Sequence, residues 1–150
     1  MDEIRKMLIE RACERLVTEY CHFVDHGEAA KIAGQFTDSG VWASGSYVLS
    51  GREAIENYFQ KRQSKSGRMS RHVCTNLLVN VVDEDNATGV VYLTLYRHDG
   101  DADQTLSPSE APEMIGEYRD TFVRSAKGWH FERREIHASF ARFREATLKS

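Results

Sequence analysis

The spacing of the apolar residues changes once along this chain, near residue 70, and that change restricts the fold more than any other feature. In residues 3–24 the apolar side chains recur at four-residue steps, which predicts a long amphipathic helix. The other elements predicted before residue 70 are two shorter helices, at 29–36 and at 50–62 with Ser50 as N-cap, and two short strands, at 41–43 and 47–49.

After residue 70 the apolar residues alternate with polar ones, which predicts strands at 72–82, 87–97, 114–124 and 129–138. Helices followed by consecutive strands are typical of the α+β class. A chain of 150 residues fits one domain. We therefore predict a single domain over residues 1–150, shaped as a cone. In it a strongly curved mixed or antiparallel sheet carries three N-terminal helices on one face and encloses a cavity.

Charge and hydropathy exclude several classes of function. The net charge is −3, so the chain as a whole does not attract nucleic acid or an anionic membrane. No apolar run approaches the roughly 18 residues of a membrane span. We expect a cytoplasmic protein without nucleic-acid or membrane partners.

The cysteines and histidines do not form an obvious metal site. Cys13, Cys21 and Cys74 are odd in number and lack a Cys-x-x-Cys spacing, which argues against a disulfide framework and against thiolate zinc. We predict reduced thiols in a packed interior. His22 and His26 stand four residues apart, as two metal ligands can, but no third ligand is identifiable. We expect no metal and no cofactor.

Several short motifs cover nearly the whole chain in a defined order. They are Tyr20 and Asp25 near the end of the first helix, Phe36-Thr37-Asp38-Ser39-Gly40, Gly51-Arg52-Glu53-Ala54-Ile55, Arg71-His72-Val73-Cys74-Thr75-Asn76, the run 116–124, Gly128-Trp129-His130-Phe131 and Arg134. In this order and spacing the chain resembles the SnoaL-like branch of the nuclear-transport-factor-2-like superfamily. The resemblance implies the α+β cone already predicted.

The resemblance also implies a chemistry. Scytalone dehydratase, bile-acid 7α-dehydratase and hexachlorocyclohexane dehydrochlorinase belong to this superfamily and remove a proton from carbon with an Asp–His pair. Asp25 and His72 match that pair, Tyr20 matches a tyrosine of the dehydratases, and Arg134 matches an arginine of the dehydrochlorinase. The dehydratases carry a further polar or ionisable residue where this chain has residues 94–96, so the resemblance does not transfer a substrate.

These residue types suit proton transfer on physical grounds. Histidine has an unperturbed pKa of about 6.5, near the working pH of a general base. A neighbouring carboxylate fixes the imidazole tautomer and stabilises the imidazolium. Tyr20 is predicted to donate a hydrogen bond to a substrate oxygen. A pocket for a small hydrophobic cyclic substrate is predicted from Trp42, Tyr58, Phe59, Asn76, Tyr92, Tyr96 and Phe122.

The predicted function is therefore a cofactor-independent lyase or isomerase, and two alternatives stay open. In a non-catalytic ligand-binding or assembly module, His72 is an ordinary strand histidine, Asp25 only ends a helix and Tyr20 only packs in the core. In a protein like the small subunit of ring-hydroxylating dioxygenases, a large partner subunit is required.

Association of identical chains is predicted from the outer face of the sheet. Leu93, Leu95, Thr121 and Val123 are assigned to that face, which would be too apolar to stay exposed. We expect a homodimer or homotrimer through it. The tail, residues 139–150, is predicted to lie across a neighbour or to close the cavity.

Overall fold

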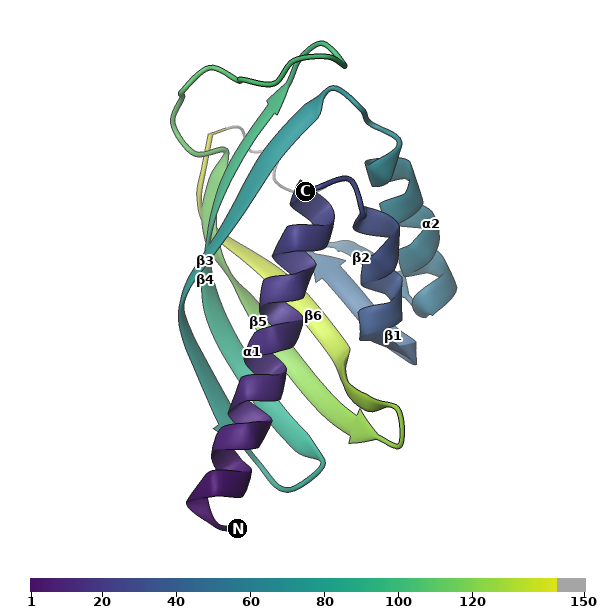
Figure 1. Cartoon of the computed structure of the whole chain (residues 1–150), viewed down its shortest axis with the longest axis vertical. Helices are drawn as coiled ribbons and strands as arrows, with labels where there is room; N and C mark the ends of the chain where they lie inside the picture. The colour runs from purple at the N-terminus through teal and green to yellow at the C-terminus, as the bar shows by residue number, and fades with distance from the viewer. Residues whose placement is uncertain (143–150) are drawn as a thin grey trace.

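The long helix α1 (Glu3–Asp25) lies across the concave face of a curved sheet (Figure 1). The computed structural model describes residues 1–142, so most of the predicted covering tail lies outside the described residues. The Asp2 carboxylate caps α1 by accepting a hydrogen bond from the backbone N–H of Arg5 at 2.8 Å. Gly27, with a φ of 76°, follows the end of the helix. The predicted helix at 3–24 is confirmed to within one residue.

The second and third helical segments differ in detail from the prediction. Segment η1 (Ala29–Gln35) is a 3-10 helix, and α2 (Arg52–Gln63) is an α-helix. The predicted N-cap Ser50 is instead the last residue of strand β2 (Tyr47–Ser50), and Gly51 takes the N-cap position. Gly51 has a φ of 90°, which favours glycine and lets the chain turn from the strand into the helix.

Six strands form one mixed sheet, as predicted, in the order β2-β1-β6-β5-β4-β3. Strands β1 and β6 pair in parallel, and every other neighbouring pair is antiparallel. The two predicted short strands and the four long ones are all present. Besides β2 they are β1 (Phe36–Ser44), β3 (Arg68–Val81), β4 (Asn86–Asp99), β5 (Met114–Ser125) and β6 (Gly128–Ala141).

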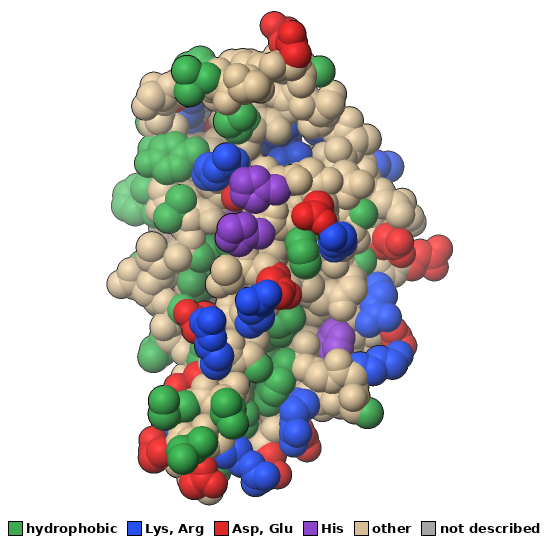
Figure 2. All heavy atoms as spheres, in the orientation of Figure 1, with side chains coloured by type: hydrophobic (Ala, Val, Ile, Leu, Met, Phe, Trp, Pro, Cys, Tyr) green, Lys and Arg blue, Asp and Glu red, His purple; other side chains and the backbone are tan. Residues whose placement is uncertain are grey.

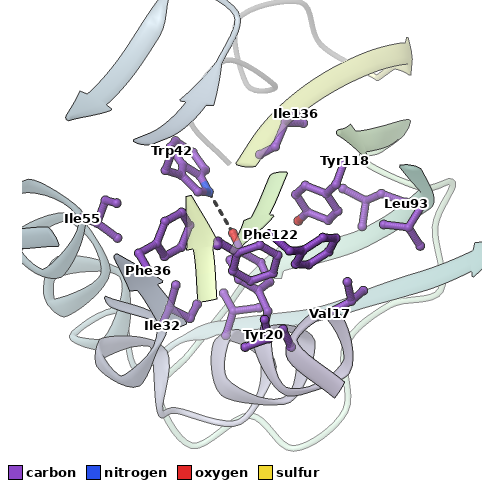
Figure 3. Close-up of a cluster of buried hydrophobic side chains, with 14 of the residues drawn as sticks. Val17, Tyr20, Ile32, Phe36, Trp42, Ile55, Leu93, Tyr118, Phe122 and Ile136 are labelled. Carbon is purple, nitrogen blue, oxygen red and sulfur yellow. Dashed lines mark hydrogen bonds between the residues drawn. The ribbon is translucent and has the colours of Figure 1, made fainter. Parts of the chain in front are cut away.

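The core lies between the concave face of the sheet and the helices, and aromatic rings dominate it (Figure 3). The Tyr20 ring packs edge-on against Phe59, Tyr118 and Phe131, with centroid separations of 6.0, 5.6 and 6.4 Å. These contacts connect α1 and α2 to the two central strands. The core therefore fixes where α1 ends relative to the strands beside it.

The inward and outward faces of strand β4 are reversed relative to the prediction. Leu93 and Leu95, assigned to the outer face, are buried against the helices, whereas Tyr92 and Tyr96 are 53% and 45% exposed. Successive side chains alternate between the two faces, so one choice of face reverses all four positions. A buried tyrosine hydroxyl needs a hydrogen-bond partner. Because β4 buries its leucines, its tyrosine hydroxyls need no such partner in the core. Tyr92 and Tyr96 therefore do not line the interior.

Asn76 also does not line the interior, because β3 contains a bulge. The pairing of β3 with β4 shifts between Thr75 and Leu78, and Asn76 takes a φ of 56° within the irregularity. After His72 and Cys74 the inward face therefore continues with Leu77, and Asn76 is exposed. Asn76 therefore does not lie on the interior face, where it was predicted to bind substrate.

The outer face of the sheet carries a different set of apolar residues from the one predicted. Thr121 and Val123 are partly exposed there, but the leucines of β4 are not. Val73 pairs with Thr94, Thr94 with Ile115 and Ile115 with Phe140, and the strand register thus forms one row across four strands. Val73, Ile115 and Phe140 are exposed, as are the flanking tyrosines of β4. Association through this face stays a prediction, which the molar mass in solution would test.

Within residues 1–142, no helix combines the length and the apolar character that crossing a membrane requires.

Candidate active site

Asp25 and His72 are brought together at the end of α1. The Nδ1 atom of His72 lies 2.6 Å from Oδ1 of Asp25, and the backbone N–H of His72 donates to Oδ2 at 2.8 Å. The two side chains are only 7% and 6% exposed. The carboxylate therefore contacts the histidine at both the ring and the backbone, which fixes the position and the orientation of the imidazole.

Local structure explains why the two residues meet. Asp25 is the last residue of α1, where the side chain can extend past the helix end toward β3. His72 is on the inward face of β3, two residues after Ser70 and two before Cys74. The packing of α1 on β3 then sets the separation of the pair.

Two further residues support Asp25, and sequence reasoning missed both. The Ser70 hydroxyl donates to Oδ1 of Asp25 at 2.8 Å, and Nη2 of Arg62 donates to Oγ of Ser70 at 3.0 Å. The alternation of β3 places Ser70 on the same face as His72, which is a signal the sequence did contain. Arg62 comes from the end of α2, and no local pattern predicts its contact with β3.

The environment favours a neutral imidazole beside a carboxylate. Burial lowers the pKa of His72, and the attraction of Asp25 does not fully offset this effect. Burial raises the pKa of Asp25, but the hydrogen bonds from His72 and Ser70 outweigh it, so the pKa of this carboxyl falls below its ordinary value. At neutral pH the carboxylate is charged and His72 can accept a proton.

The second ring nitrogen of His72 is available for chemistry. Within residues 1–142, Nε2 of His72 has no hydrogen-bond partner. It is also not among the fully enclosed unpaired side-chain atoms of that part of the chain, which are Gln35 Oε1, Thr37 Oγ1 and Arg134 Nη1. A basic nitrogen that is held in place but not hydrogen-bonded is what proton abstraction requires.

Arg134 lies in the same interior but is paired with a different carboxylate. Its Nε donates to Oδ1 of Asp120 at 2.9 Å, and both side chains are completely buried. The guanidinium carbon lies 3.6 Å from the ring centroid of Tyr118 and 4.2 Å from that of Tyr20. Arg134 Nη1 is buried without a hydrogen-bond partner in residues 1–142. Sequence reasoning identified Arg134 but not its partner Asp120.

Tyr20 is a core residue whose hydroxyl oxygen accepts a hydrogen bond from Nε1 of Trp42 at 3.0 Å (Figure 3). Burial raises the pKa of Tyr20 well above its ordinary value, so the hydroxyl keeps its proton. The rings of Trp42 and Tyr58 lie 5.1 Å apart, and those of Trp42 and Phe59 lie 5.8 Å apart. These rings, with the buried Phe122, fill much of the interior that they were predicted to line.

A small hollow of about 120 Å³ lies between β3, β4 and the loop 100–113. Its lining includes Ser70, but also the exposed Arg71 and Tyr96, and it contains neither Asp25 nor His72. Ligand pockets usually enclose roughly 300–1,000 Å³, so this hollow accommodates only a small chemical group. A cavity for a ring-bearing substrate stays a prediction.

His22 and His26 lie apart from the pair. Both are exposed near the C-terminal end of α1, and their stacked rings have centroids 5.6 Å apart. Neighbouring histidine side chains are visible on the surface in Figure 2. In residues 1–142 no group of three or more His, Cys, Asp or Glu side chains is arranged to hold a metal ion.

Comparisons with known proteins agree with this architecture. Residues 5–135 match the model of the SnoaL-like domain. A presumed scytalone dehydratase from Novosphingobium aromaticivorans has a similar structure, with a TM-score of 0.78, 20% identity, and coverage of 93% of this chain and 89% of that one. LinA, a hexachlorocyclohexane dehydrochlorinase, has a TM-score of 0.76 at 18% identity and coverages of 93% and 92%.

A third similar structure is that of a single-residue variant of Rv3472 from Mycobacterium tuberculosis, a protein of unknown function. Its TM-score is 0.73 at 24% identity, with coverage of 98% of this chain and 80% of that one. No curated protein matches the chain by sequence. At these identities the similar structures show a shared fold and not a shared reaction.

Proposed function

Because the chain belongs to the SnoaL-like domain family, we propose that it is a cofactor-independent lyase or isomerase in which His72 removes a proton from carbon. The observation that carries this proposal is the buried hydrogen bond of 2.6 Å between Asp25 and His72. The carboxylate contacts both the ring and the backbone N–H of His72, which holds the imidazole in the fixed orientation that a general base needs. The structural relatives include proteins named for elimination reactions.

In the proposed reaction, Nε2 of His72 takes the proton of a substrate C–H bond. The electron pair of that bond forms a carbon–carbon double bond, and in a lyase the leaving group departs with its own bonding pair. Asp25 accepts a hydrogen bond from the Nδ1–H group, so this proton stays on the imidazole. The carboxylate also stabilises the imidazolium that forms. In a lyase the imidazolium then gives the proton to the leaving group or to solvent, and in an isomerase it returns the proton to another atom of the same substrate.

Tyr20 and Arg134 are proposed to polarise the substrate. The Tyr20 oxygen accepts from Trp42, so its own proton stays available for a hydrogen bond to a substrate oxygen. The buried Nη1 of Arg134 is a second available donor in the interior. Both groups can polarise a leaving group or carbonyl only if the substrate reaches past His72 into the core. We propose a small hydrophobic molecule as the substrate, because aromatic rings dominate the core that it would enter.

One observation favours the non-catalytic alternative. Tyr20, Trp42, Phe59 and Phe122 are each at most 2% exposed, and their rings belong to one packed core. A binding or assembly module needs no access to His72 and would tolerate such packing. The dioxygenase-subunit alternative requires a large partner, which co-purification would reveal.

The proposal is tested by screening small cyclic β-hydroxy ketones and halogenated cyclohexanes for loss of water or hydrogen halide by mass spectrometry. On any substrate so found, His72→Ala and Asp25→Asn should lower kcat by about 10²–10⁴-fold while the protein stays folded. His22→Ala, an exposed histidine of α1, is the matched control and should leave kcat unchanged. An unaltered rate in His72→Ala would reject the assignment, and a ligand that binds to the wild type without conversion would favour the binding module.

A further inference from the structure

Two cysteines that are far apart in the sequence are in contact beside the Asp25–His72 pair. The Sγ atoms of Cys21 and Cys74 lie 3.4 Å apart, and the residues are 53 positions apart in the chain. Cys21 is one helical turn before Asp25 on α1, and Cys74 is two residues after His72 on the same face of β3. The two thiols therefore form a second contact between α1 and β3, beside the Asp–His contact.

The separation of the two sulfur atoms can be compared with the length of a disulfide bond. A disulfide has an S–S bond of about 2.05 Å, so the sulfur atoms must approach by about 1.4 Å. Side-chain rotation at both cysteines can supply much of this change. The hydrogen bonds of Asp25 to His72 already hold the end of α1 against β3 and keep the two thiols together.

The two thiols differ in access. Cys21 is buried, whereas Cys74 is partly exposed. The thiols contact each other, and either sulfur can be the hydrogen-bond donor. Because a small oxidant reaches the more exposed thiol more easily, Cys74 is the thiol that reacts first, as its thiolate, and Cys21 is placed to react second.

We propose that Cys21 and Cys74 are a redox-active pair that forms a reversible disulfide by exchange with a small disulfide such as oxidised glutathione. The Cys74 thiolate attacks one sulfur of oxidised glutathione, forms a mixed disulfide and releases one glutathione thiolate. Cys21 then loses its proton and attacks Sγ of Cys74, which releases the second glutathione. Two protein thiols are oxidised to one disulfide, and oxidised glutathione is reduced to two glutathione molecules.

The disulfide links α1 covalently to β3 next to the residues that hold His72. It closes a chain segment of about 50 residues in the unfolded protein, so the oxidised form should unfold at a higher temperature, by about 5–15 °C. In a reducing compartment the link is transient. It therefore provides the fold with a modification site that senses the thiol–disulfide balance.

The reduced, purified chain is incubated with oxidised glutathione, its free thiols are alkylated, and its peptides are mapped by mass spectrometry. The expected result is a Cys21–Cys74 cross-link, alkylated Cys13, a raised Tm and full reversal by dithiothreitol. Cys13→Ser, which removes the third cysteine from the same helix, should behave as the wild type does. Cys21→Ser should stop at a glutathione adduct on Cys74, since no second thiol is in reach.

Two results would overturn the proposal. One is a wild-type chain that carries only glutathione adducts after prolonged incubation, which would mean that the two sulfur atoms cannot close. The other is a native chain that does not react while the urea-unfolded chain does, which would mean that the folded protein excludes the oxidant. Both results come from the wild-type protein, so a serine variant that fails to fold does not affect the decision.

Discussion

Two buried carboxylates are each paired with a basic side chain, and the two pairs differ in what the base can do. Asp25 holds His72 near the end of α1, whereas Asp120 holds Arg134 between β5 and β6 in the centre of the core. An imidazole gains and loses a proton near neutral pH, but a guanidinium stays protonated in proteins. Only in the first pair can the basic partner therefore exchange a proton near neutral pH, although both pairs are buried and hydrogen-bonded.

The surroundings of the two pairs match this difference. The guanidinium of Arg134 is completely buried and enclosed by the rings of Tyr20, Tyr118 and Phe131, which stabilise a permanent cation. Burial raises the pKa of Asp120 to about 6, against the attraction of Arg134. His72 instead keeps Nε2 without a partner in residues 1–142. One core thus contains a permanent ion pair and a pair whose basic partner is neutral, and the type of base separates them.

The largest expected effect comes from removing each carboxylate in turn. Asp120→Ala leaves a permanent charge buried without its partner and should lower the free energy of unfolding by about 3–5 kcal/mol. Asp25→Ala leaves an imidazole that can stay neutral, so the loss should be smaller, about 1–3 kcal/mol. Urea unfolding of both variants measures the difference.

A surface ion pair provides the control for that measurement. Arg11 and Glu14 are 2.8 Å apart on the exposed side of α1, and Glu14→Ala should change the stability by no more than about 1 kcal/mol. If Asp120→Ala costs no more than Asp25→Ala, the distinction between a permanent and a proton-dependent pair is wrong.

A smaller effect should appear in the pH dependence of stability. The pKa of His72 is lowered in the folded protein, so as pH falls through about 6.5 the unfolded chain binds a proton that the folded chain does not bind. Stability conferred by the neutral ring is thus lost below a pH of about 6.5, by at most about 1.4 kcal/mol per pH unit. His72→Gln should lack this loss.

The test compares the unfolding free energies of the wild type and His72→Gln between about pH 5 and 7.5, the range around the ordinary pKa of histidine. Asp120, with its pKa raised to about 6, contributes with the opposite sign, but it does so in both proteins and cancels in the difference. Asp25 has a lowered pKa, so its contribution is lost only below its ordinary value of 3.8, outside this range. Parallel curves for the two proteins would contradict the predicted neutral state of His72.

The smallest effect is expected from Ser70→Ala. The change removes the hydroxyl that donates to Asp25 and accepts from Arg62, and it should cost about 1 kcal/mol of stability. It should also raise the pKa of Asp25, because the lost hydrogen bond favours the carboxylate. NMR titration of the Asp25 carboxyl measures the shift, with Ser64→Ala, an exposed serine, as control. An unchanged pKa would mean that the serine does not support the pair.

Much of this protein was determined by the sequence alone. The apolar spacing predicted the helices and, after its change near residue 70, the four long strands, because local periodicity depends on the face that each element buries. The two short strands before residue 70 were also predicted. The family motifs also identified Asp25 and His72 as a candidate pair before their contact was seen. Helix type and the start of α2 were less accurate, since a 3-10 turn and a glycine with positive φ at Gly51 depend on the neighbouring strand.

The tertiary structure decided which faces and which distant residues meet. On β4 both faces carry large apolar or aromatic residues, so alternation could not tell Leu93 from Tyr92, and only the packing of the sheet on α1 buried the leucines. The contacts of Arg62 with Ser70, of Asp120 with Arg134 and of Cys21 with Cys74 join residues from separate elements. Their physical reason is geometric: the sequence sets the spacing along one helix or strand, whereas the separation between elements exists only after they have packed.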